Sequence, residues 1–241
     1  MFKNMMLWIC LFTAFMIGLC TTIVAAASTP VRLVRWDEEI LRRFVEMPFI
    51  ISVFTSMFLG TDFSNGTLRN KLIIGSNRTA IYFSNLAVVV SGGLMIMTAE
   101  LLPSVVYGIR VAAVQPGIYT AEFWKKTIVC MLVIISYCAL LTLLGMISTK
   151  KAITVVSSIG ITILCFVTAP IIKNKLDDQS GYYRGYVRAA LTFADNALPF
   201  GTINRANGYS ENLDAAPLYS LGVITVSTGV GVAIFRKRDL R

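Results

Sequence analysis

Few side chains in this 241-residue chain could carry covalent chemistry, and none is arranged as a catalytic site. Histidine is absent, which removes the commonest general base and the commonest transition-metal ligand. The sequence also has no GxxxxGK[ST] phosphate loop, no GxGxxG fingerprint and no Cys/His metal spacing. We therefore predict no catalytic residue, no metal site and no cofactor bound by this chain, and we do not expect it to be an enzyme.

Two kinds of candidate remain, the cysteines and one carboxylate. All five cysteines lie in apolar runs, where a thiol behaves as a small hydrophobic group. Glu100 also lies in an apolar run, and an intramembrane carboxylate is a functional candidate. At about 1.5 Å per residue from Ile81, Glu100 lies about 28 Å along a helix, near the far side of a hydrocarbon core about 30 Å thick. This count favours an interfacial carboxylate.

The elements that carry these residues are predicted to be membrane-spanning helices. Hydrophobic residues make up 56% of the chain and charged residues 15%, against about 45–50% and about 25% in soluble domains. Six apolar runs are close to the roughly 17–25 residues that a helix needs to cross a bilayer, and they lack the alternation of a membrane β-barrel. We predict one all-α integral membrane domain over residues 1–241, with spans at residues 5–27, 44–60, 81–109, 127–148, 152–172 and 217–235.

The distribution of Lys and Arg predicts the orientation. The net charge of +9 is concentrated in short clusters beside the apolar runs, so we expect a lipid bilayer and no nucleic acid as partner. Six spans put both termini on one side, and short cytoplasmic loops retain Lys and Arg. Cytoplasmic termini give the inner side Lys3, Arg69, Lys71, Arg78, Lys150, Lys151, Arg236, Lys237, Arg238 and Arg241 against Asp62 and Asp239.

The first apolar run has a second interpretation. Lys3, an apolar core and the small residues Ala25 to Ala27 also resemble a secretory signal peptide with its cleavage site. The apolar stretch is longer than the usual signal core of about 7–15 residues, which favours a retained helix.

Two long polar segments are predicted on the outer side. Residues 28–43, with Trp36 and Ile40 at helical spacing, predict a short amphipathic helix at the membrane interface, with a solvated connector as the alternative. Residues 173–216 are too long for a simple connection. Within them, the apolar residues 191–201 predict a re-entrant element beside a pathway. Its candidate residues are Asp195, Asn196, Pro199, Phe200 and Gly201, with Pro199 and Gly201 breaking the helix.

The polar segment that joins the second and third spans is the most informative part of the chain. Asp62 or Ser64 can cap a short helix there, and Gly75 can end it in a left-handed conformation. The composition also fits an ordinary basic connector. A helix at this place would act as a rigid lever, because a partner that pushes on it must move both attached spans.

Two sequences in the chain resemble the permease subunits of bacterial ABC transporters of the type-2 exporter class. They are DFSNGTLRNKLIIGSNRTAIYFSN, from Asp62 to Asn85, and VSTGVGVAIFRKRDLR, from Val226 to Arg241. Such permeases are similar in having six spans, a D/E-x-x-x-G-T-[LI]-[RK]-N-K-like loop after the second span and a last helix that runs into a basic tail. The chain departs from them at its start, because the first span begins almost at Met1 without a preceding amphipathic segment.

This resemblance implies a mechanism and partners. The loop after the second span would be a coupling helix seated in a separately encoded ATPase, which would use ATP and Mg. Two permease copies would form the transporter in the bacterial cytoplasmic membrane, and the loop between the last two spans would fold as short helices over the outer mouth. The implied coupling residues are Asp62, Gly66, Thr67, Leu68, Arg69, Asn70 and Lys71.

We therefore predict the transmembrane subunit of an ATP-driven exporter. The alternative is a non-transporting membrane sensor or immunity protein that binds a ligand through its outer loop at residues 173–216. No motif in the sequence identifies a cargo.

Overall fold

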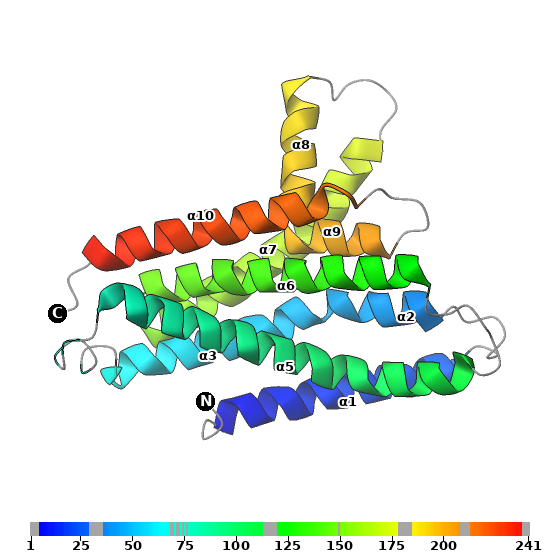
Figure 1. The fold of residues 1–241 in the computed structure, drawn as a ribbon, viewed down its shortest axis with the longest axis horizontal. Helices are drawn as coiled ribbons and strands as arrows, with labels where there is room; N and C mark the ends of the chain where they lie inside the picture. Colours follow the sequence, from blue (N-terminus) through cyan, green and yellow to red (C-terminus); the bar gives the residue numbers. More distant parts are fainter. Residues whose placement is uncertain are drawn as a thin grey trace.

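The computed structural model describes residues 5–28, 36–67, 70, 73, 75, 77–112, 120–148, 150–177, 185–207 and 213–237. Within these ranges the chain consists of helices and turns without a strand (Figure 1). Six of the helices are long and apolar enough to cross a membrane, so the chain is an all-α, multi-pass membrane protein. The elements in order are α1 (Met5–Ser28), α2 (Trp36–Arg42), η1 (Arg43–Val45), α3 (Met47–Ser64), α5 (Arg78–Ala112), α6 (Ala121–Ile147), α7 (Lys151–Asp177), α8 (Tyr186–Ala197), α9 (Pro199–Ala206) and α10 (Ala216–Lys237).

Each predicted span coincides with one long helix, and the largest difference is in the second. Its helical path begins at Trp36 rather than Phe44, because α2, η1 and α3 follow one another as a single 29-residue candidate span. The sequence prediction excluded the charged residues before Phe44. The fold accommodates them because buried Arg43 donates from Nη2 to Glu39 Oε1 at 2.7 Å, which gives the guanidinium a charged partner.

The predicted interfacial helix has a different environment from the one expected. A helix is present from Trp36 to Arg42, but its apolar residues Trp36, Ile40 and Leu41 are buried within the protein. The Trp36 ring lies 4.7 Å from the ring of Tyr107 on α5. The helical spacing of these residues therefore reflects packing on other spans rather than on lipid headgroups. Leu33 lies outside the described residues.

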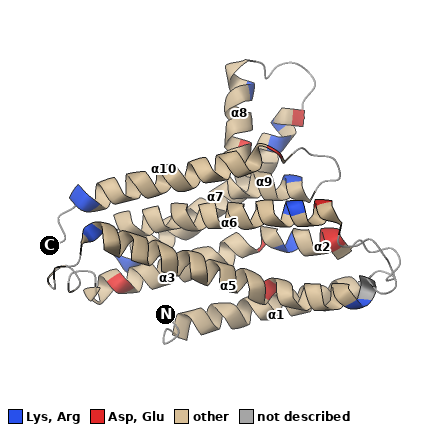
Figure 2. Ribbon diagram, viewed as in Figure 1, with Lys and Arg blue, Asp and Glu red and all other residues tan. Residues whose placement is uncertain are grey.

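The bundle is built around α3, α5 and α6, which contact one another, while α1 packs along α5, α7 along α3 and α10 along α6. The start of α1 and the end of α10 lie toward the same end of the bundle, and α8 stands out steeply from the other helices (Figure 1). Lys, Arg, Asp and Glu gather mainly toward the two ends of the bundle (Figure 2). This is the arrangement expected if the apolar middle lies in hydrocarbon.

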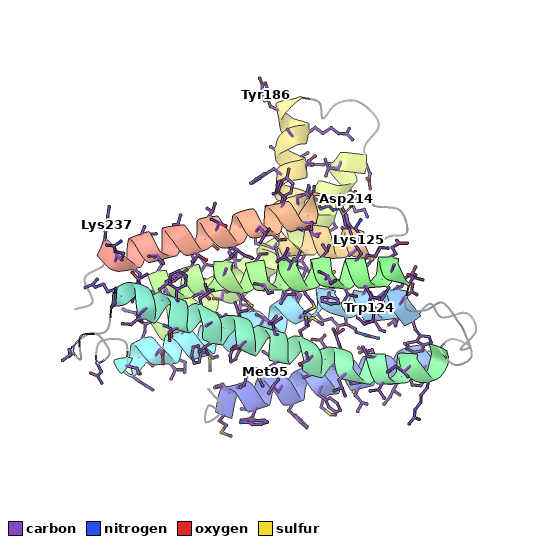
Figure 3. The ribbon with its side chains drawn as sticks, in the orientation of Figure 1. Met95, Trp124, Lys125, Tyr186, Asp214 and Lys237 are labelled. Atoms are coloured by element: carbon purple, nitrogen blue, oxygen red, sulfur yellow. The ribbon has the colours of Figure 1, made fainter. Side chains whose placement is uncertain are left out.

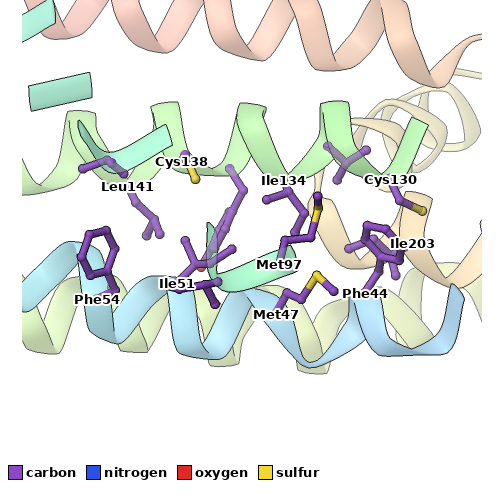
Figure 4. Close-up of a cluster of buried hydrophobic side chains, with 14 of the residues drawn as sticks. Phe44, Met47, Ile51, Phe54, Met97, Cys130, Ile134, Cys138, Leu141 and Ile203 are labelled. Carbon is purple, nitrogen blue, oxygen red and sulfur yellow. The ribbon is translucent and has the colours of Figure 1, made fainter. Parts of the chain in front are cut away.

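Buried aliphatic, aromatic and sulfur-containing side chains fill the space between the central helices (Figure 4). The cluster brings η1 and α3 against α5, α6 and α9. Its members include Phe44, Met47, Ile51 and Phe54 from η1 and α3, Met97 from α5, Cys130, Ile134, Cys138 and Leu141 from α6, and Ile203 from α9. Four of the five cysteines are buried and all five are free thiols, as expected for small hydrophobic groups.

The contact between α1 and α5 depends on a glycine. A Cβ at position 18 would lie 2.1 Å from the backbone oxygen of Glu100, so any larger residue there must push the two helices apart. We expect Gly18→Val to lower the free energy of unfolding by about 1–3 kcal/mol. Gly222→Val on α10, where a Cβ meets nothing within 4 Å, is the matched control. The comparison is made by SDS titration in detergent, and equal stability of the two variants would contradict the close contact.

Candidate functional site

The connection between α3 and α5 contains the residues that the sequence motif singled out. Asp62 lies in the last turn of α3, and the chain then turns through Gly66, which has a φ of +65°. The backbone N–H of Asn70 donates to the carbonyl of Gly66 at 3.0 Å, which closes one helical turn that includes Thr67. Gly75 has a φ of +90°, which has the positive sign that the sequence analysis predicted for this glycine. Leu68, Arg69 and Lys71 lie outside the described residues.

The end of α3 lies further along the chain than the sequence predicted. α3 continues to Ser64 instead of ending at Gly60, so both proposed capping residues, Asp62 and Ser64, lie in its last turn. Capping of the following helix by either residue stays a prediction. The hydroxyl of Ser64 donates back to the carbonyl of Thr61 at 3.1 Å, within the same helix. The helix extends beyond the apolar run because the hydroxyls of Thr61 and Ser64 donate hydrogen bonds to carbonyls of α3 and so do not interrupt it.

Arg78 links the start of α5 to the end of α10. Its Nη1 donates to the carbonyl oxygens of Phe235 at 3.4 Å and Arg236 at 3.3 Å. These carbonyls belong to the last turn of α10, where a cation is favoured by the helix dipole and by the unpaired carbonyls. The sequence analysis counted Arg78 only among the basic residues of the inner side. The basic cluster did not indicate this contact, because its partner is a backbone 157 residues away.

A second contact joins the end of α3, next to this connection, to the start of α7. A Cβ at Gly60 would lie 3.2 Å from the Cα of Lys151, so α3 and the start of α7 approach closely there. The connection at residues 65–77 is therefore attached directly to α3 and α5, and through Arg78 and Gly60 to α10 and α7. Four of the six spanning helices meet around it.

The second cluster of predicted residues lies where α8 turns into α9, and we call residues 195–205 the elbow. Asp195 and Asn196, at the end of α8, are 6% and 5% exposed. Arg205 on α9 places Nε 3.0 Å from Asp195 Oδ2, and its Nη2 donates to Asn196 Oδ1 at 2.6 Å. One guanidinium thus pairs with both buried polar side chains and holds the two short helices together.

Phe200 anchors the elbow among the spans. It is fully buried, and its ring lies 5.6 Å from that of Phe49 on α3 and 5.4 Å from that of Phe166 on α7. α9 also contacts α6, α2 and η1. The short helix is therefore inserted between spanning helices, in line with a re-entrant element, whereas Tyr186 at the tip of α8 is 96% exposed (Figure 3).

Of the two residues predicted to break the helix in the elbow, Pro199 lies at the break and Gly201 does not. Leu198 adopts an extended conformation with ψ 139°, and Pro199 begins α9, where its missing N–H costs nothing. Gly201 lies inside α9 and breaks no helix. Its role is steric, because a Cβ there would lie 2.2 Å from the backbone oxygen of Asp195. Arg205 was not among the predicted residues, since only the turn of the chain brings it to Asp195.

Neither protein-family models nor curated proteins give a match to this chain.

Proposed function

We propose that this chain is the transmembrane permease subunit of an ATP-binding-cassette transporter of the type-2 exporter class, in a bacterial cytoplasmic membrane. In this proposal the α3–α5 connection docks on a separate ATPase, and the spans form a translocation pathway with a second permease subunit. ATP and Mg are used by the partner.

The observation that carries the proposal is the mechanical position of the α3–α5 connection. It joins two central helices, and contacts through Arg78 and Gly60 link the ends of those helices to α10 and α7. A force applied by an ATPase at this place would move four spans together.

Two further features support the same proposal. The apolar windows of α1, α7 and α10 are each only 22% buried, which leaves apolar surface for lipid and for a second permease subunit. The elbow, held between spans by Phe200, would close the outer mouth of the pathway.

The test is purification of the tagged chain from its own cells in mild detergent. We expect a stoichiometric partner with a GxxxxGK[ST] motif and ATPase activity. A cysteine at exposed Asn70 should crosslink to that partner, and one at Tyr186 should not. A chain that purifies without an ATPase, or an ATPase that crosslinks equally at both positions, would contradict the proposal and favour a non-transporting receptor.

The orientation gives a separate prediction. With Cys20 replaced by Ala, the remaining native thiols are buried, so new single cysteines report on their own positions. Tyr186→Cys on α8 should react with a membrane-impermeant maleimide in intact cells, and Asn70→Cys should react only after permeabilisation. The reverse pattern would invert the topology.

A further inference from the structure

Glu100 on α5 is deeply buried. Its side chain is 0% exposed, and neither carboxyl oxygen has a hydrogen-bond partner among the residues that the structure describes. Gly18, whose Cβ would touch the Glu100 backbone, comes 13 residues after the start of α1 (18 − 5) and 10 before its end (28 − 18). At about 1.5 Å per residue both ends of α1 are roughly 15–20 Å away. Glu100 therefore lies opposite the middle of α1, far from both of its ends, whereas the count along the sequence from Ile81 favoured an interfacial position.

The charges around Glu100 do not balance. The charged side chains that act on it are Glu46 and Arg43, from the segment that joins η1 to α3, and α1 on the other side has no charged residue. Arg43 is already engaged, with Nη2 2.7 Å from Glu39 and Nη1 3.9 Å from Glu46. The charged residues of α6 and α10 lie near the helix ends, at Glu122, Lys125, Lys126, Arg236 and Lys237. The one guanidinium that acts on Glu100 is thus shared with the carboxyl groups of Glu39 and Glu46, and Glu39 also lies 3.8 Å from Arg42.

We infer that Glu100 is a proton-binding site inside the membrane, which holds its proton in this conformation and releases it when the α1–α5 contact opens. An ionised carboxylate without a partner is far costlier to bury than a neutral acid. A divalent cation would need several ligands, and no three Cys, Asp or Glu side chains converge as a metal site in the described part of the chain. A proton requires only the one carboxyl group.

In this inference the proton leaves on the side of Arg43 and Glu46, the charged residues that act on Glu100. A groove of about 460 Å³ between α1 and the α2–η1 segment is lined by Glu39, Arg42 and Arg43. The side chain of Glu46 is 40% exposed. On release, the O–H bond of Glu100 breaks and the proton passes to the Glu46 carboxylate and then to water. The Glu100 carboxylate left behind would require Arg43 or water as its new partner, so proton loss is linked to movement of these helices.

Infrared spectroscopy of the purified full-length chain in liposomes tests the inference without reference to transport. The wild type should show the carbonyl band of a protonated carboxylic acid at neutral pH, with a small shift in D₂O. Glu100→Gln should lose this band, and Glu122→Gln, which changes an exposed carboxylate, should retain it. A wild-type spectrum without the band, or a band unchanged in Glu100→Gln, would overturn the proton site.

Thermal unfolding in detergent gives an independent readout. If folded Glu100 keeps its proton and unfolded Glu100 releases it, the folded state binds more protons, so stability falls as pH rises. As the pH is raised from acidic to alkaline, the melting temperature of the wild type should therefore fall more than that of Glu100→Gln. At neutral pH the Glu100→Gln variant should be at least as stable as the wild type. A variant that is less stable than the wild type by an amount that grows with pH would instead indicate an ionised, paired Glu100 and would refute the inference.

Discussion

Gly66→Val is expected to uncouple the chain from its ATPase while leaving it inserted and folded. Gly66 has a φ of +65°, and a Cβ there meets nothing within 4 Å, so the substitution strains only the backbone. A β-branched residue in this conformation costs about 1–3 kcal/mol, and about 1.4 kcal/mol corresponds to tenfold in an equilibrium constant. We therefore expect roughly tenfold or greater loss of ATPase affinity, measured by copurification and by the ATPase rate of the reconstituted complex.

The chain offers a matched control for this experiment. Gly185, just before α8, has a φ of +61° and equally open space around its Cβ position. Gly185→Val imposes the same backbone strain far from the α3–α5 connection and should leave ATPase binding intact. Gly66→Asn should retain most of the coupling, because Asn tolerates positive φ. If Gly66→Val binds and stimulates the ATPase like the wild type, the connection does not transmit force.

Arg205→Met is expected to cause the largest loss of stability among these substitutions. It leaves the buried carboxylate of Asp195 and the amide of Asn196 without their shared partner. Breaking a buried ion pair from one side costs about 3–5 kcal/mol. The free energy of unfolding, measured by SDS titration, should fall by about that amount, and the elbow should become sensitive to protease.

Two further variants distinguish the loss of the buried ion pair from the loss of a positive charge as such. Adding Asp195→Asn to Arg205→Met removes the orphaned charge and should recover part of the stability. Lys125→Met breaks the ion pair to Asp214, which is 2.6 Å long but has both side chains at least 60% exposed (Figure 3). Such a pair contributes within about 1 kcal/mol. Equal losses for Arg205→Met and Lys125→Met would show that burial at the elbow is unimportant.

The local composition of the sequence was enough to predict the number of spanning helices and their approximate bounds. A run of apolar residues must be helical to cross hydrocarbon, because its backbone groups have no other hydrogen-bond partners there. The same local logic anticipated a positive φ at Gly75 and a helix break at Pro199. Each of these depends on one residue or one segment alone.

Contacts between distant segments were decided only by the tertiary structure. Arg78 is fixed by carbonyls at the end of α10, 157 residues further along the chain. Arg205 reaches Asp195 only after the chain has turned at Leu198. Glu100 lies opposite the middle of α1 because α1 and α5 meet closely at Gly18. Helix packing sets these relations through steric fit and charge pairing between residues far apart in the chain, so no local pattern contains them.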